Sequence, residues 1–315
     1  MSGHVVALCG GVGGAKLAHG LARVLPVGEL TVIVNTGDDF RHLGLWVSPD
    51  IDAVVYALAD LYDPVRGWGR RDESWNFMTA LAGLGGETWF QLGDADLAMH
   101  VERTQRLAAG EPLGAVTERI RRQLGIAAAI LPMSDDPVST RVRTDSGWLD
   151  FQEYFVHRRC EPAVRDLEYV GAATARALPA ALAALARPDL RAVVICPSNP
   201  FLSIEPILAL PAMRRALDAA RAPVVAVTPI IGGEAVKGPA AKMLRELGFE
   251  SGSAAVARRY AGLADLFISD AADPLPEPVP GLRIVRAPTL MTGVPEREAL
   301  AREVLRQADA AAAAP

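Results

Sequence analysis

The segment 10–14 reads Gly-Gly-Val-Gly-Gly and lies between two segments of different periodicity. The preceding run, 4–9, is short and apolar throughout, as a buried strand is, and 15–24 has apolar residues at helical spacing. A second short apolar run follows at 30–34. Strand, helix and strand in this order are typical of the βαβ unit of a parallel sheet. The glycine loop and its flanks therefore predict an α/β fold.

The same alternation returns in the C-terminal half of the chain. The strands and helices expected there are strands 192–196, 224–227 and 266–269 and helices 212–220 and 240–247. Because both halves supply buried strands, we expect one Rossmann-like, doubly wound and mostly parallel sheet. Its nucleotide-binding core would comprise residues 1–73 and 171–315.

The intervening segment, 74–170, has a different character. The elements expected in it are helices at 96–109 and 115–124, a strand at 127–131, and a hairpin of strands 138–143 and 148–156 around Asp145-Ser146-Gly147. We interpret 74–170 as an inserted α+β cap beside the sheet.

Composition excludes several classes of protein. The 315 residues carry a formal net charge of −5, and this acidic balance argues against nucleic acid as a partner. No apolar run approaches the ~20 residues that span a bilayer, and no export signal precedes the first strand. We therefore expect a cytoplasmic protein without a membrane partner. The three separated cysteines indicate neither a disulfide framework nor a zinc motif.

The glycine loop predicts an anion site. The amides of Gly10, Gly11, Gly13 and Gly14 can approach phosphate oxygens, and the N-terminus of the following helix favours negative charge. The loop lacks the Gly-Lys-Ser/Thr ending of a Walker A loop, and Lys16 stands where a dinucleotide fingerprint needs its third glycine. Lys16 either contacts phosphate or faces solvent. A purely structural turn is the alternative to phosphate binding.

Carboxylates gather after the second expected strand, at the edge where doubly wound sheets bind ligands. Asn35-Thr36-Gly37-Asp38-Asp39 ends that strand, and Ser48-Pro49-Asp50-Ile51-Asp52 begins the next helix. Adjacent carboxylates there could hold Mg²⁺ together with phosphate and water oxygens. Capping is the alternative, with Ser48 as N-cap and Asp50 stabilised by the helix dipole. Four acids exceed what capping requires, so we expect a functional cluster.

Other polar and aromatic residues are weaker candidates. Pro197-Ser198-Asn199-Pro200 ends a buried strand and offers hydroxyl and amide groups suited to a base or sugar edge. His100, inside a helix, is more simply a packed or solvated side chain than a catalyst. Trp68 and Trp75 could stack on a flat ring, although aromatic residues more often serve a core. Esterase, zinc-protease and thioredoxin motifs are missing from the sequence, and phosphoryl-type transfer fits better.

Several ordered segments combine into one pattern. They are the glycine loop with Ala15-Lys16-Leu17, the Asn-Thr-Gly-Asp-Asp and Ser-Pro-Asp-Ile-Asp segments, and residues 131–137, 151–155, 197–204 and 289–291. Together they resemble the 2-phospho-L-lactate transferase family over nearly the whole chain. Because the motifs are independent of one another, this resemblance is more specific than any single glycine loop.

The resemblance implies a reaction and a site. A phospholactyl group, or enolpyruvyl or glyceryl phosphate, would pass from a GDP-linked donor to the deazaflavin alcohol FO with release of GMP, in biosynthesis of coenzyme F-420. Mg²⁺ is the implied cofactor, with Asp38, Asp39 and Asp50 as metal ligands and Asp38 and Asp52 as catalytic residues. The implied binding residues are Gly10, Gly11, Gly13, Gly14, Lys16, Asn35, Thr36, Asp52, Pro197, Ser198 and Asn199. We also expect a homodimer.

Two positions depart from the family pattern. Ala95 stands where an arginine is expected between acids, and Glu205 replaces the glycine of a Ser-Ile-Gly-Pro motif. No motif distinguishes the three possible three-carbon groups. A non-catalytic nucleotide-binding regulatory protein of the same fold is the second hypothesis, but it would have little use for the acidic cluster. A dinucleotide oxidoreductase is the third, and the incomplete glycine spacing argues against it.

Overall fold

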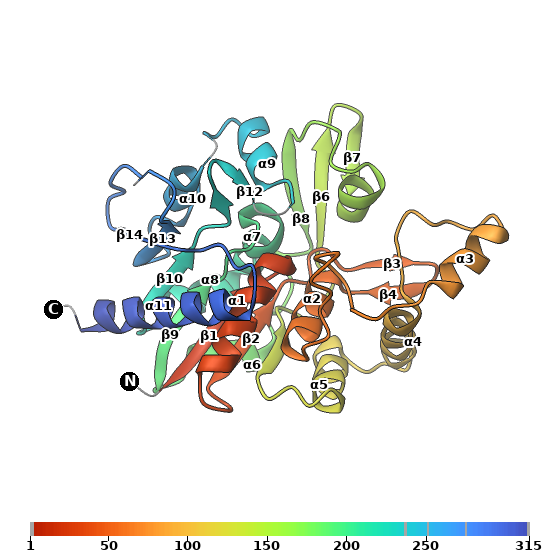
Figure 1. Cartoon of the computed structure of the whole chain (residues 1–315), viewed down its shortest axis with the longest axis horizontal. Helices are drawn as coiled ribbons and strands as arrows, with labels where there is room; N and C mark the ends of the chain where they lie inside the picture. Colours follow the sequence, from red (N-terminus) through yellow and green to blue (C-terminus); the bar gives the residue numbers. More distant parts are fainter. Residues whose placement is uncertain (1–2, 236–237, 251, 275, 314–315) are drawn as a thin grey trace.

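The computed structural model describes residues 3–235, 238–250, 252–274 and 276–313 (Figure 1). Within these ranges the core is a seven-stranded sheet whose neighbouring strands all pair in parallel. In sheet order the strands are β14 (Arg283–Ala287), β13 (Leu266–Asp270), β10 (Val224–Val227), β9 (Leu190–Ile195), β1 (His4–Cys9), β2 (Leu30–Val34) and β5 (Ala129–Pro132). The expected α/β, Rossmann-like parallel sheet is confirmed.

The strand order reverses direction at β1. The chain proceeds from β1 to β2 and β5 on one side of the sheet and then to β9, β10, β13 and β14 on the other. A crevice forms outside the carboxyl ends of the strands at such a switch point, and ligands of doubly wound sheets bind there. The loops that follow β1 and β9 therefore lie at the position where a ligand is expected.

Helices cover both faces of the sheet. The helices on one face are α1 (Gly11–Val24), α2 (Pro49–Leu58), α5 (Leu113–Gln123) and α11 (Val294–Ala312), packed through Leu17, Val54 and Leu300. Those on the other face are α6 (Pro179–Leu185), α7 (Glu205–Leu208), α8 (Pro211–Asp218), α9 (Ala240–Glu246) and α10 (Ser253–Tyr260), packed through Met213, Leu244 and Val256. Burial on both faces explains why the strands are continuous apolar runs.

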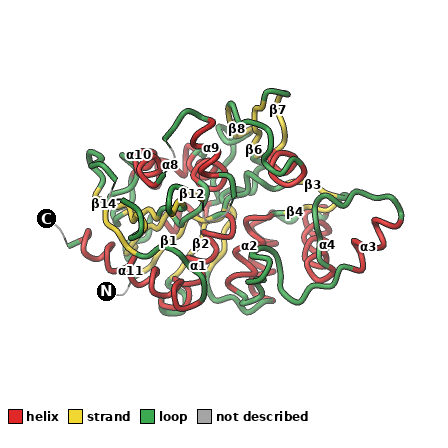
Figure 2. The backbone as a smooth tube through the Cα atoms, turned by 45° about the horizontal axis from the view of Figure 1, so that its top comes forward, coloured by secondary structure: helices red, strands yellow, loops and turns green. Residues whose placement is uncertain are grey.

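Two smaller units flank the carboxyl edge of the sheet. An arm extends from one end of the molecule (Figures 1 and 2) and contains β3 (Phe40–His42), β4 (Leu45–Val47), α3 (Asn76–Gly83) and α4 (Asp94–Ala108). An antiparallel sheet is formed by β7 (Gly147–Asp150), β6 (Ser139–Thr144) and β8 (Asp166–Val170), with the π-helix η1 (Glu153–His157) beside it. The short strands β11 (Ile230–Ile231) and β12 (Glu234–Ala235) pair with each other.

The structure corrects three details of the sequence-based expectations. The segment 74–170 is not one separate cap, because its strand β5 pairs with β2 inside the central sheet. The second hairpin strand ends at Asp150 instead of residue 156, because Phe151 and Tyr154 turn into the core and the backbone becomes helical. Helix α1 begins at Gly11, so the glycine loop is itself the first turn of the helix.

Among the described residues, no helix is both long enough and apolar enough to span a bilayer. The cytoplasmic location and the homodimer stay predictions.

Candidate functional site

A cavity of about 650 Å³ lies at the carboxyl edge of the sheet, beside the switch point. Its wall combines strand-end loops of the core with residues of the arm and of η1. The lining residues that carry polar or charged groups include Lys16, Asp38, Asp50, Asp52, Tyr56, Asp96, His100, Gln152, Ser198, Asn199, Ser203, Thr228 and Thr289. The cavity thus joins most of the predicted site residues with several that were not predicted.

The glycines of the loop are required mainly because protein atoms approach it closely. A Cβ at Gly13 would collide with the carbonyl oxygen of Pro197, and one at Gly14 would collide with Ser198 Oγ. A Cβ at Gly10 would collide with Asp50 Oδ2. The loop is therefore packed between the end of β9 and the start of α2, and only small residues fit.

Hydrogen bonds fix the same loop in place. Ser198 Oγ accepts a hydrogen bond from the Gly10 amide at 3.1 Å and donates to the Gly10 carbonyl at 2.7 Å. The Gly11 amide donates to Asp50 Oδ1 at 2.5 Å. The amides of Val12 and Gly13 belong to the first turn of α1, where N–H groups have no intrahelical acceptor, and both residues line the cavity. These two amides are the donors of the loop that are available to a group in the cavity.

Lys16 extends the cationic side of the cavity. Its Nζ donates to the Met291 carbonyl at 3.2 Å, and both residues line the cavity. Among the described lining residues it is the only lysine or arginine. Burial, and then the charge of Arg297, lower the pKa of Lys16. Lys16 therefore lies along the cavity wall and does not extend into open solvent.

Asp38 and Asp50 form a buried carboxyl pair on the cavity wall. Asn35 Nδ2 donates to Asp50 Oδ2 at 2.9 Å and to Asp38 Oδ1 at 3.3 Å, so one amide bridges both acids. Burial raises the pKa of Asp50 to about 6, against the lowering effect of the Asn35 hydrogen bond. Burial and the neighbouring Asp50 raise the pKa of Asp38 well above its ordinary value. The two carboxyl groups are thus held together away from water, where ionisation of both is unfavourable.

Two other predicted binding residues lie behind this pair. Asn35 contacts the acids and the Leu202 carbonyl, and Thr36 is also buried. Asn35 therefore orients carboxylates and does not offer its own amide to the cavity.

Asp39 is turned away from the carboxyl pair. It accepts hydrogen bonds from Ser48 Oγ at 2.7 Å and from Trp46 Nε1 at 3.2 Å, and burial raises its pKa to about 8. Ser48 therefore precedes α2 without capping it through its side chain, unlike the capping alternative. Among the described residues, no three His, Cys, Asp or Glu side chains form a ready-made metal cluster.

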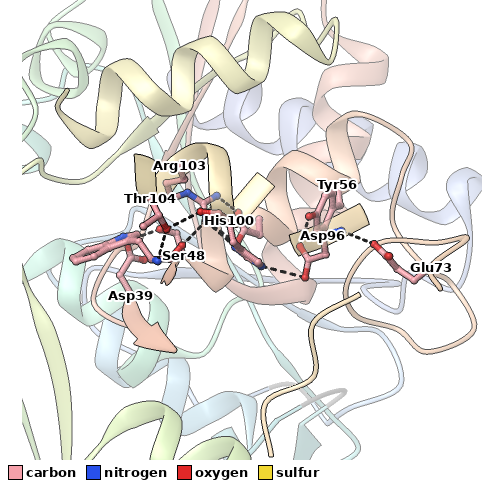
Figure 3. Close-up of polar contacts among 10 residues, drawn as sticks. Asp39, Ser48, Tyr56, Glu73, Asp96, His100, Arg103 and Thr104 are labelled. Atoms are coloured by element: carbon pink, nitrogen blue, oxygen red, sulfur yellow. Dashed lines mark hydrogen bonds and ion pairs between the residues drawn. The ribbon is translucent and has the colours of Figure 1, made fainter. Parts of the chain in front are cut away.

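A second polar group lines the arm side of the cavity (Figure 3). Arg103 donates to Asp52 from both terminal nitrogens, to Oδ2 at 3.2 Å and to Oδ1 by a shorter contact. His100 Nε2 lies 3.2 Å from Asp96 Oδ2, and Tyr56 donates its hydroxyl proton to Asp96 Oδ1. Burial raises the pKa of Asp96, but its contacts with His100 and Tyr56 outweigh that effect and leave the pKa lowered.

Sequence reasoning missed most of this group. The sequence analysis did not single out Asp96, Tyr56 or Arg103. In this region an acid near the start of each helix caps the other helix. Asp94 of α4 accepts the Phe77 amide of α3, and Glu73, which precedes α3, accepts the Ala95 and Asp96 amides of α4.

The departures from the family pattern lie away from the cavity chemistry. Ala95 contributes its amide to the Glu73 cap. Glu205, which directly follows η2 (Pro200–Ile204), pairs with Arg259 at 3.1 Å and does not line the cavity. Asn199 caps η2, because its Oδ1 accepts the amides of Phe201 and Leu202.

Aromatic side chains form the remaining wall. Trp68 lines the cavity. The Trp75 ring contacts the Trp68 ring edge-on, with 6.5 Å between the ring centroids. The sequence analysis did not single out Trp89, which also lines the cavity and stacks on His157 at 5.1 Å between centroids. Phe90, Phe151 and Phe155 complete this apolar surface.

A family model described as 2-phospho-L-lactate transferase CofD matches residues 5–279, which is most of the chain. The chain belongs to the CofD family of transferases. The predicted family is thus confirmed, and with it the assignment to an enzyme class. The CofD-family match includes every strand end that lines the cavity except the segment around Thr289 and Met291.

Individual relatives of this CofD-family chain carry two different names. The phosphoenolpyruvate transferase of Streptomyces griseus is 42% identical over 314 residues, covering 97% of this chain and 98% of that protein. The 2-phospho-L-lactate transferase of Methanosarcina mazei is 39% identical over 305 residues, covering 96% and 99%. Among solved structures, a UPF0052-family protein from Bacillus halodurans superposes with a TM-score of 0.62 at 15% identity, covering 97% of this chain and 99% of that one. That likeness shows the fold alone.

Proposed function

We propose that this CofD-family transferase moves a phosphorylated three-carbon acid group from a GDP-linked donor to the deazaflavin alcohol FO and releases GMP. The observation that supports this proposal is the composition of one cavity. Helix-terminal amides and a lysine, a buried carboxyl pair, and an aromatic wall all line it. These are the surfaces that a diphosphate, a metal ion and a planar ring would each require.

The donor is assigned to the side formed by the glycine loop and the loop after β9. The Val12 and Gly13 amides lie at the N-terminus of α1, which attracts phosphate through unpaired N–H groups and the helix dipole. Lys16 supplies the positive charge on the same wall. Pro197 and Ser198 line the adjoining surface, where the guanosine would extend along the end of β9.

Asp38 and Asp50 are the residues that would hold Mg²⁺. Their carboxyl groups are buried side by side. Burial is the main reason that both pKa values are raised, and the charge of Asp50 raises that of Asp38 further. Oxygen donors of this kind suit Mg²⁺, which commonly takes one or two carboxylates and completes its shell with phosphate and water. When bound, the ion would shield charge on the phosphate oxygens. Asp39 faces Ser48 and is therefore not proposed as a Mg²⁺ ligand.

The acceptor is assigned to the aromatic wall and to Asp52. The planar ring would lie among Trp68, Trp89 and Phe155, which line that part of the cavity. Its primary alcohol oxygen would bond to the phosphorus that carries the three-carbon group while the bond to GMP breaks. We propose Asp38 and Asp52, which both line the cavity, as the carboxylates that orient the hydroxyl and accept its proton.

The proposal is tested by product formation. Purified protein is incubated with FO, Mg²⁺ and each guanosine-linked donor in turn, bearing a lactyl, enolpyruvyl or glyceryl group, and the phosphodiester product is sought by mass. We expect product and stoichiometric GMP with at least one donor, and the preferred donor identifies the three-carbon group. Binding of the nucleotide without turnover of any donor would instead support a non-catalytic nucleotide-binding protein.

A further inference from the structure

We infer that Arg103 is a positioning residue for the acceptor end of the cavity, acting through Asp52 and His100. The inference rests on the proposed function, because it concerns which substrate each wall of the cavity serves. Arg103 is completely buried on helix α4 of the arm, whereas Asp52 belongs to α2 of the core. One guanidinium therefore connects the arm to the core beside the part of the cavity proposed for the acceptor.

The Arg103–Asp52 contact determines the orientation of a carboxylate on the cavity wall. Both terminal nitrogens donate to Asp52, one to each oxygen, which is the planar two-point geometry that arginine forms with carboxylates. A lysine at this position could not reproduce it, because an ammonium presents a single point charge. Arg103 thus fixes the rotation of the Asp52 carboxylate.

The same guanidinium also orients His100. Arg103 Nη1 lies 3.3 Å from His100 Nδ1, and a guanidinium can only donate, so Nδ1 is the acceptor. With Nδ1 accepting, the ring proton is on Nε2, which faces Asp96 at 3.2 Å. Asp96 in turn accepts the Tyr56 hydroxyl. Removal of Arg103 would therefore disturb four residues that line the cavity.

The hydrogen bonds of the Arg103 group do not include those of the donor side. The hydrogen bonds of Asp38 and Asp50 run to Asn35 and Gly11, and those of the glycine loop run to Ser198. Within the described residues, the Arg103 side chain bonds to Asp52, to His100 and, at 3.5 Å, to the Trp46 carbonyl. The oxygens of Asp52 and Asp96 suit hydroxyl or N–H groups of an acceptor. Loss of Arg103 should consequently weaken binding of the acceptor and leave binding of the donor unchanged.

The test compares Arg103→Met and Arg103→Lys with wild type in steady-state kinetics at saturating Mg²⁺. We expect Arg103→Met to raise KM for FO by about tenfold or more while KM for the donor stays within about twofold. Arg103→Lys should recover only part of the loss. Arg106→Met is the matched control, since Arg106 lies one turn away on α4 and pairs with Glu102 at the surface. An unchanged KM for FO, or equal rises for both substrates, would overturn the inference.

Two further measurements separate loss of FO binding from misfolding and from loss of turnover. Asp52→Asn/Arg103→Met removes both buried charges, so it should fold even where the single variant does not, and its affinity for FO should be no worse than that of Arg103→Met. Calorimetric binding of FO alone, without donor, tests the inference independently of turnover. Absence of product from wild type would reject the proposed reaction, whereas equal FO affinity in wild type and Arg103→Met would reject the role of Arg103.

Discussion

The side-chain amide of Asn35 donates to Asp50 Oδ2 at 2.9 Å. The same nitrogen reaches Asp38 Oδ1 at 3.3 Å and the Leu202 carbonyl at 3.1 Å, while the Asn35 carbonyl accepts the Gly37 amide at 2.7 Å. Asn35 immediately follows β2, whose position in the sheet is fixed by pairing on both sides. The central sheet therefore sets the spacing of the two carboxylates through one amide.

Asn35→Leu removes this bridge at nearly constant volume. We expect turnover to fall roughly 10- to 100-fold, as is common when a residue that orients metal-binding carboxylates is lost. The Mg²⁺ concentration that gives half-maximal rate should rise, because the two acids lose their common donor. Rates measured across a Mg²⁺ titration check this. Asn76→Ala is the control, since Asn76 bonds to Asp94 at the exposed start of α3. A wild-type titration curve for Asn35→Leu would remove Asn35 from the site.

Asp38→Asn should separate activity from stability. Because burial and Asp50 raise the pKa of Asp38, the neutral amide relieves an unfavourable charge. We expect an equal or higher melting temperature together with a loss of turnover of about 100-fold or more, a trade-off typical of functional sites. Thermal unfolding and product formation are measured on the same preparation. Unaltered turnover would show that Asp38 is not part of the reaction.

Asp52→Asn should behave differently, although both acids line the cavity. Its replacement leaves the fully buried Arg103 guanidinium without its carboxylate, and breaking a buried ion pair commonly costs about 3–5 kcal/mol. We therefore expect a marked fall in the urea midpoint as well as in turnover. Equal unfolding free energies for Asp52→Asn and wild type would contradict the buried ion pair.

The elements of the core could be predicted because the relevant signals are local. Strands β1, β2 and β10 are short apolar runs bounded by turn residues, and their predicted limits agree with the structure. The pairing of β5 with β2 could not be predicted, because almost a hundred residues separate them and no local pattern encodes the partner of an edge strand.

The site likewise contains residues that could be predicted from the sequence and residues that could not. Carboxylates at strand ends pointed to Asp38 and Asp50, because parallel strands bring their carboxyl ends to one edge. The partnership of Arg103 with Asp52 crosses from the arm to the core over 51 positions, and in sequence Arg103 is one of several charged residues on an amphipathic helix. The roles of the glycines were also only partly foreseen, since packing against Pro197 and Ser198 became visible only in three dimensions.

Gly13→Ala tests that packing. The added methyl group would collide with the Pro197 carbonyl, a backbone atom that cannot rotate away. We expect a loss of about 1–3 kcal/mol of unfolding free energy, the usual cost of overpacking, and impaired binding of the nucleotide. Chemical denaturation and GDP binding are the measurements. Gly83→Ala on α3 is the control, because its Cβ would meet no described atom within 4 Å. Equal stabilities of both variants and wild type would refute the packing argument.

His42 provides a pH-dependent prediction away from the acids. Its ring is buried on β3 and contacts the Trp89 ring edge-on at 4.9 Å, and its Nε2 has no hydrogen-bond partner among the described residues. Burial lowers the pKa of His42, against a smaller raising effect of Glu87. Below the ordinary value of 6.5, the unfolded chain therefore binds a proton that the folded protein binds only at lower pH. His42 consequently lowers the free energy of unfolding as the pH falls from 6.5 toward its lower pKa in the folded protein.

His42→Phe preserves an aromatic ring among Trp89 and Phe90 and removes the titrating group. At pH 7.5 we expect an unfolding free energy close to that of wild type, because the replaced nitrogen makes no hydrogen bond within the described residues. At pH 5.5 the variant should be the more stable of the two, since only wild type must exclude a proton from this position. Urea unfolding of both proteins at the two pH values measures the difference. A difference that stays constant with pH would mean that His42 titrates alike in the folded and unfolded chains, and its burial against Trp89 would then carry no proton linkage.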